Sequence, residues 1–77
     1  MNKVVYNDKL KITVSVNGEA FSCTSPVFLE QLLEYLDFNM QTIIVEYNSA
    51  IINKKKLAST KLQNRDKIEI VTIVGGG

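Results

Sequence analysis

Few residues in this sequence have side chains that could do chemistry. Its 77 residues include no histidine and one cysteine, so the commonest general base is missing and a cysteine-rich metal site cannot form. Serine and threonine hydroxyls have no imidazole to activate them. The sequence also lacks a paired-carboxylate motif, a G-x-G-x-x-G segment and a P-loop. We therefore expect a protein that is not an enzyme, with no catalytic residue, no metal ligand and no bound cofactor.

The C-terminal glycines are the exception. Gly75, Gly76 and Gly77 follow an apolar stretch, and three residues without a Cβ make a thin tip that could enter a narrow channel. At about 3.3–3.6 Å per residue, this tip would reach about 10 Å. Its reactive group is the Gly77 carboxylate, a poor electrophile that must be activated elsewhere, most simply as an acyl-adenylate. A truncated or frayed end would explain the glycines equally well.

A hairpin is the first element expected to support this tip. Ile12, Val14 and Val16 alternate with polar residues, the period of a half-buried strand, and Asn17-Gly18 is typical of a type I′ turn. The two-residue loop predicts three directly opposed pairs: Val16 with Glu19, Val14 with Phe21, and Ile12 with Cys23. Because directly opposed residues share a face, Cys23 should lie in the core as an unreactive thiol.

A helix should follow the hairpin. Four leucines recur at helical spacing: Leu29, Leu32, Leu33 and Leu36. Ser25 is expected to cap this helix and Pro26 to take its first position. Its end is expected near Phe38-Asn39, and its leucines should pack in the core.

The second half of the chain predicts three more strands, over residues 42–47, at Ile51-Ile52 and over residues 67–74. Leu57 and Leu62 should anchor the irregular segment between them. In the last strand Ile68 and Ile70 should face the helix, which turns Lys67, Glu69, Val71 and Ile73 outward. Val71 and Ile73 would then be exposed apolar residues beside the tail, and we expect them to dock a partner.

This order of elements predicts an α+β chain with a β-grasp fold, a mixed sheet of four to five strands packed on one helix. The final strand should lie in the middle of the sheet, beside the first. Residues 1–10 would be an extension, either loose or a short strand, residues 11–74 the β-grasp domain, and residues 75–77 a flexible glycine tail.

Charge and hydropathy restrict the partners. Nine Lys and Arg against eight Asp and Glu give a net charge of +1, which predicts no nucleic-acid or membrane partner. Residues 53–56 should be a solvated basic corner, with contact to an acidic partner as the alternative. We expect a monomer when free, located in the cytoplasm, or in the plastid stroma if the gene is organellar.

Three segments carry a resemblance to a known family: residues 16–19 in the hairpin, Leu32-Leu33 with Leu36, and residues 68–77 with the terminal glycines. On these residues the sequence resembles the thiamine-biosynthesis sulfur carriers, the ThiS family of ubiquitin-like β-grasp proteins. Arg65-Asp66 stands where that family usually has Gly-Asp, so this turn is altered but its aspartate is present.

The resemblance implies a mechanism and a set of partners. An adenylating, E1-like enzyme would use ATP to convert the Gly77 carboxylate into an acyl-adenylate. Sulfur from a persulfide on a sulfur donor protein would replace AMP and leave a thiocarboxylate on Gly77. Thiazole synthase would then accept that sulfur while it builds the thiazole ring of thiamine.

Three alternatives remain open at this point. The small subunit of molybdopterin synthase shares the fold, the Gly-Gly end and the thiocarboxylate, although that family favours a proline-containing stretch where residues 71–74 read Val-Thr-Ile-Val. A ubiquitin-like modifier would form isopeptide bonds through Gly77. A plain interaction module would make no use of the tail.

Overall fold

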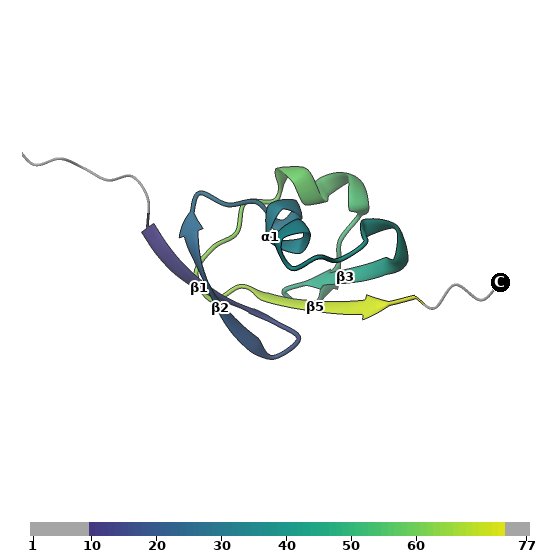
Figure 1. Ribbon diagram of the computed structural model, residues 1–77, viewed down its shortest axis with the longest axis horizontal. Coiled ribbons are helices and arrows are strands. Elements are labelled where there is room, and N and C mark those ends of the chain that lie inside the picture. Colours follow the sequence, from purple (N-terminus) through teal and green to yellow (C-terminus); the bar gives the residue numbers. More distant parts are fainter. Residues whose placement is uncertain (1–9, 74–77) are drawn as a thin grey trace, which may run out of the picture.

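Five strands and one α-helix make up residues 10–73, the part of the chain that the computed structural model describes. The strands are β1 (Leu10–Val16), β2 (Glu19–Ser25), β3 (Ile43–Tyr47), β4 (Ala50–Ile51) and β5 (Lys67–Thr72), in the sheet order β2-β1-β5-β3-β4. The helix α1 (Leu29–Tyr35) covers one face of this sheet, and two 3-10 helices, η1 (Met40–Thr42) and η2 (Lys54–Ser59), lie in the connections (Figure 1). The predicted β-grasp arrangement is confirmed.

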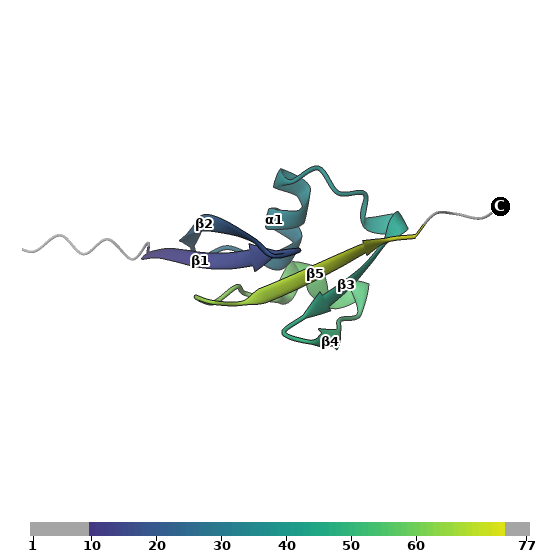
Figure 2. The same ribbon diagram turned by 90° about the horizontal axis from the view of Figure 1, so that it is seen from below.

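The final strand lies in the middle of the sheet, as the sequence predicts. β5 runs parallel to β1 on one side and antiparallel to β3 on the other, and Figure 2 shows it crossing the open face between them. Its inward residues Ile68 and Ile70 are 0% and 8% exposed. They join a core between sheet and helix whose fully buried members include Leu29, Leu33, Ile43, Leu57 and Leu62.

The first hairpin has the predicted register, and its turn has a second role. All three predicted pairs occur, and Asn17 and Gly18 have φ values of 50° and 83°, the positive values that a type I′ turn needs. Asn17 also contacts the final strand. Its N–H donates to the Ile68 carbonyl at 2.9 Å, and its Oδ1 accepts from the Ile70 N–H at 2.7 Å. Asn17 thus continues the β1–β5 contact beyond the last paired residue of β1.

The predicted start of the helix is wrong. Ser25 belongs to β2 and Pro26 is not helical; α1 begins at Leu29, after Phe28 in an extended conformation. The cause is a long-range contact, because the Leu29 N–H donates to the Thr60 carbonyl and the Leu62 N–H donates to the Val27 carbonyl, both at 2.8 Å. These bonds hold residues 27–28 extended against residues 60–62. Ser25 does not cap the helix. Instead, the Gln31 side-chain oxygen accepts a hydrogen bond from the N–H of Phe28, the residue just before the helix.

The helix also ends earlier than expected, at Tyr35. Asp37 has a positive φ of 69°, a left-handed conformation that stops helical propagation. The Phe38 N–H donates to the Leu33 carbonyl and the Asp37 N–H to the Glu34 carbonyl, each at 3.0 Å, which is the Schellman pattern of helix termination. The aspartate takes the position where glycine is usual, so the sequence offered no glycine signal for this end.

The remaining boundaries shift by one or two residues. Asn48 and Ser49, with φ values of 50° and 75°, form a two-residue turn that pairs Tyr47 with Ala50. β4 is therefore Ala50–Ile51 and not Ile51-Ile52. Thr42 belongs to η1, so β3 starts one residue late, and β1 already includes Leu10.

One buried charge anchors the start of β5. Asp66 is 7% exposed, and its carboxylate accepts hydrogen bonds from the Tyr47 hydroxyl, from Asn48 Nδ2 at 3.1 Å and from the Gln63 N–H at 2.7 Å. Arg65, with a φ of 74°, takes the left-handed position that glycine adopts most easily. Through Asp66, the turn that precedes β5 is joined to Asn48 in the turn that follows β3.

The Asp66 contact predicts an alkaline limit to stability. Burial, then the hydrogen bond and the charge of Asp66, raise the pKa of Tyr47 to about 12. An unfolded tyrosine has a pKa of about 10, so folding favours the neutral phenol. This contribution to the free energy of unfolding is complete below pH 10 and is lost as the pH rises towards 12. In a Tyr6→Phe, Tyr35→Phe chain, ultraviolet titration should give a midpoint near 12 for Tyr47. A midpoint at the unfolded value of about 10 would contradict the Asp66 contact.

Candidate functional site

The site predicted from the sequence begins where β5 ends. Gly75, Gly76 and Gly77 lie outside the described residues, so the role of the tail stays a prediction. The structure does describe the segment that precedes it. After the last β3–β5 pair, Ile43 with Thr72, the Ile73 N–H donates to the Thr42 carbonyl. The chain is therefore bound to β3, and to Thr42 just before it, up to the last residue described.

Both edges of β5 are held. On the β1 side, the Ser15 N–H donates to the Asp66 carbonyl at 2.9 Å, and Asn17 makes the two contacts with Ile68 and Ile70. On the β3 side, five residue pairs run from Tyr47 opposite Ile68 to Ile43 opposite Thr72. β5 is therefore bound on the β1 side as far as Ile70 and on the β3 side as far as Thr72.

The open face of the sheet carries exposed apolar side chains at this end of β5. Val71 is 54% exposed and Ile73 44%, which confirms that they face outward. Ile44, 38% exposed, lies directly opposite Val71 on β3. We call Ile44, Val71 and Ile73 the apolar patch. Ile44 was not predicted as part of the site, although the alternation of β3, with Ile43 and Val45 inside, could have placed it there.

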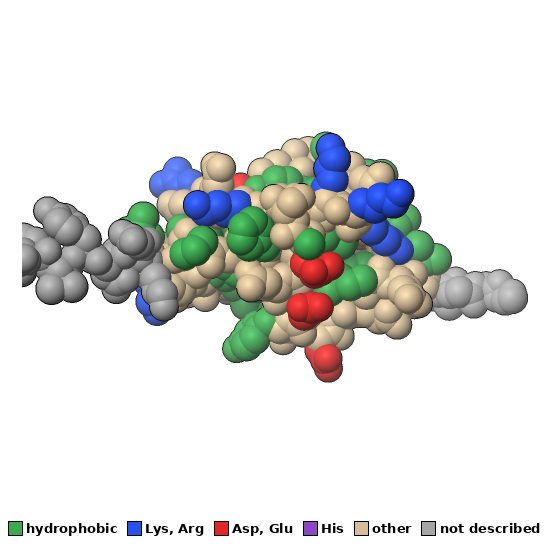
Figure 3. Space-filling view, turned by 90° about the horizontal axis from the view of Figure 1, so that it is seen from above, with side chains coloured by type: hydrophobic (Ala, Val, Ile, Leu, Met, Phe, Trp, Pro, Cys, Tyr) green, Lys and Arg blue, Asp and Glu red, His purple; other side chains and the backbone are tan. Residues whose placement is uncertain are grey.

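The helix side of the molecule is different in character. Figure 3 shows this face, where Lys and Arg side chains gather along one edge. Lys54, Lys55 and Lys56 of η2 are all exposed, as expected for a solvated basic corner. The three lysines of η2 and the apolar patch thus lie on opposite sides of the sheet.

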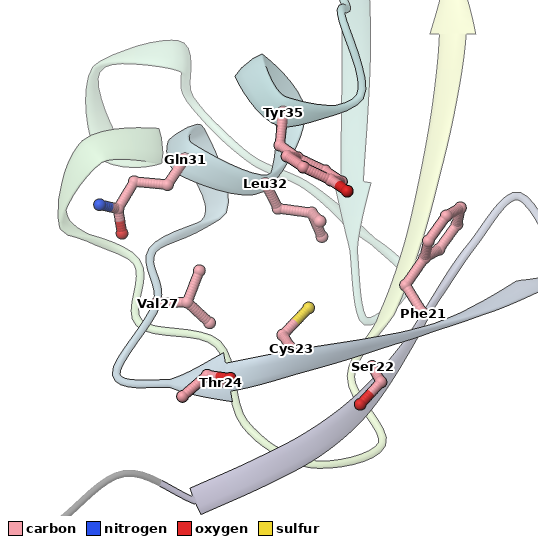
Figure 4. Close-up of a pocket in the computed structure, with 8 residues that line it drawn as sticks. All are labelled: Phe21, Ser22, Cys23, Thr24, Val27, Gln31, Leu32 and Tyr35. Carbon is pink, nitrogen blue, oxygen red and sulfur yellow. The ribbon is translucent and has the colours of Figure 1, made fainter.

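Cys23 lies where the hairpin register predicts. It is 9% exposed and lines a pocket of about 270 Å³ between β2 and α1, and in Figure 4 its sulfur points towards the helix, near Leu32. Burial raises the pKa of the Cys23 thiol, which lowers the thiolate fraction that could react. The position and the pKa both favour a structural role.

Residues 10–73 contain neither a metal-binding cluster nor a membrane-spanning helix. No three side chains among histidine, cysteine, aspartate and glutamate converge there as metal ligands. Within the same residues, no helix is long and apolar enough to cross a membrane.

Comparison with known sequences identifies relatives. The sequence model described as the ThiS family matches residues 4–77. A Porphyra purpurea protein named ycf40 is 47% identical over 66 residues, which are 86% of this chain and 93% of that protein. The sulfur carrier protein ThiS of Bacillus subtilis is 41% identical over 49 residues, which are 64% of this chain and 74% of that protein.

Two of the relatives are much longer than this chain. A Magnetococcus marinus protein named thiazole synthase is 34% identical over 64 residues, which are 83% of this chain but 20% of that protein. Among solved structures, the thiamine biosynthesis protein ThiS from Geobacter metallireducens superposes with a TM-score of 0.73 over 86% of this chain and 100% of that chain. Its sequence identity is 22%, so the likeness shows the fold.

The buried position of Cys23 predicts slow chemistry at this thiol. Iodoacetamide should alkylate Cys23 in the native chain far more slowly than in the urea-unfolded chain, because burial and a raised pKa both protect it. Cys23→Ala should lower the free energy of unfolding by about 1–2 kcal/mol, as small core truncations do. Equal alkylation rates in the native and unfolded chains would contradict the placement.

Proposed function

The chain belongs to the ThiS family of ubiquitin-like sulfur carriers, which serve thiamine biosynthesis, and from this we propose that it carries sulfur on the Gly77 carboxylate. The observation that supports this most strongly is the end of β5. A strand fixed in the middle of the sheet leads past Val71 and Ile73, both exposed, towards Gly75-Gly76-Gly77. In this proposal the protein is a carrier that partner enzymes modify, and it catalyses no step itself.

The proposed chemistry begins with activation of the carboxylate. A Gly77 carboxylate oxygen attacks the α-phosphorus of ATP in an adenylating enzyme, pyrophosphate leaves, and an acyl-adenylate forms. The terminal sulfur of a persulfide on a donor protein then attacks the acyl carbon, so that a C–S bond forms and AMP leaves. A thiol finally cleaves the S–S bond, which leaves a thiocarboxylate on Gly77 and a disulfide made from the donor sulfur and that thiol.

Thiazole synthase is the proposed acceptor of the sulfur. Support comes from the Magnetococcus marinus relative, a protein named thiazole synthase in which a segment similar to most of this chain occupies 20% of the length. Joining carrier and acceptor in one polypeptide would keep the two in contact at a high effective concentration. The family match also favours the thiamine pathway over the molybdopterin alternative.

The apolar patch is the proposed contact with the activating enzyme. Three glycines extend about 10 Å at most, so an enzyme that acts on Gly77 must approach the surface from which the tail departs. That surface includes Val71 and Ile73. Apolar side chains exposed at such a place would be covered on docking.

The first test concerns the length of the tail. Deletion of Gly77, or extension of the chain by one residue, should abolish adenylation because the reacting carboxylate is then misplaced. The readout is pyrophosphate release by the adenylating enzyme, and circular dichroism should show an unchanged fold. Adenylation of the shortened chain at the rate of the full-length chain would refute the carrier mechanism.

A second test concerns the apolar patch. Val71→Asp and Ile73→Asp should each weaken binding to the adenylating enzyme well beyond tenfold, because each places a charge where an apolar contact is expected. Calorimetry measures the affinity, and Glu34→Lys on the helix side is the control that should matter much less. Unchanged affinity in both strand variants would exclude this face as the docking surface.

A further inference from the structure

Two glutamates face each other beside the apolar patch. Glu46 on β3 and Glu69 on β5 are directly opposite residues, and they occupy the position next to the Ile44–Val71 pair on the same open face. Glu69 has a side chain that is 41% exposed, and Glu46 is half-buried. Like charges at directly opposite positions destabilise a sheet, so this acid pair opposes the fold that contains it.

The described residues compensate this charge only in part. Lys67 Nζ lies 3.9 Å from Glu69 Oε1, with the lysine side chain 60% exposed. A single contact of this kind at the surface contributes little. It is the only salt bridge found within residues 10–73. The two carboxylates thus retain a net negative charge.

Apolar residues surround the acid pair on two sides. Ile51 of β4 is opposite Glu46 and is 71% exposed, while Ile44 and Val71 form the neighbouring pair. A partner that covers these side chains would remove water from the two carboxylates. Buried charges without partners are costly, so a fitting partner must bring a cation to this position.

We propose that the acid pair and its apolar neighbours form one docking surface, and that the adenylating enzyme inserts a guanidinium between Glu46 and Glu69. This inference rests on the proposed function. A guanidinium has five donors in a plane, which allows it to bind two carboxylates at once. Its charge also removes the repulsion between them, so the surface is stabilised only when the partner is bound.

The place of the acid pair favours this partner over a second copy of the chain. Four residues follow Ile73, and at about 3.3–3.6 Å each they span about 14 Å at most. An enzyme that acts on Gly77 must therefore lie close to the end of β5, where the open face exposes Val71 and Ile73. A symmetric dimer through the same face would bring together four glutamates and only the two Lys67 side chains, a net negative charge whose repulsion disfavours it.

The test is a Glu46→Gln, Glu69→Gln chain. Its free energy of unfolding should equal or exceed that of the wild type, because repulsion is removed. Its binding to the adenylating enzyme of the same organism, measured by calorimetry, should be more than tenfold weaker and less dependent on salt concentration. A Glu30→Gln, Glu34→Gln chain makes the same chemical change on the helix and should bind as the wild type does.

Three results would overturn the inference. The first is wild-type affinity and salt dependence in the Glu46→Gln, Glu69→Gln chain. The second is loss of stability along with affinity, which would make the acid pair structural. The third is a wild-type dimer in sedimentation analysis that this variant abolishes, which would assign the face to a second copy.

The same variant separates this inference from the proposed function. At saturating adenylating enzyme, both the wild type and the Glu46→Gln, Glu69→Gln chain should acquire sulfur at Gly77. If the wild type acquires none, the proposed function fails. If both acquire sulfur and bind equally well, only the docking inference fails.

Discussion

The position of β5 between β1 and β3 is the constraint on which the rest of the structure depends. The strand makes a parallel contact on one edge and an antiparallel one on the other, and Ile68 and Ile70 are buried under the helix. Asp66 anchors its start, and Asn17 binds the backbone at Ile70. Little freedom remains for the strand, and its hydrogen bond to the Thr42 carbonyl also holds Ile73, the last residue described. A carrier that presents its terminus to enzymes benefits when the strand before that terminus is already ordered, because less conformational entropy is lost on docking.

The two faces of the sheet differ in what their side chains contact. The inner face and α1 supply the core that stabilises the fold. The open face, near the end of β5, has exposed isoleucine and valine side chains beside two opposed glutamates. Neither feature stabilises the isolated chain. Their concentration at the end of β5 is the basis of the docking surface proposed above.

Much of the fold follows from local patterns in the sequence. Asn17-Gly18 and the flanking alternation determine the hairpin register and the burial of Cys23, and alternation alone places Val71 and Ile73 on the outside. The error at the start of the helix comes from contacts between distant residues, whereas the early end of the helix and the shift of β4 come from local turns at Asp37 and at Asn48-Ser49. Thr60 and Leu62 hold Val27 and Phe28 extended, which delays the helix.

The same limit applies to the candidate site. Asn17 reaches Ile70 across 53 positions of sequence, so its second role could not be read from the turn signal. The pairing of Ile44 with Val71, and of Glu46 with Glu69, depends on the β3–β5 register. No short-range pattern specifies that register, because a long connection with its own 3-10 helix separates the two strands.

The central claim is that sulfur is carried on the Gly77 carboxylate. Tandem mass spectrometry can locate the sulfur after the full chain is incubated with the adenylating enzyme, ATP and a persulfide donor. One oxygen of Gly77 should be exchanged for sulfur, in the wild type and in Cys23→Ala alike. Sulfur found on Cys23 as a persulfide, with Gly77 unmodified, would contradict it.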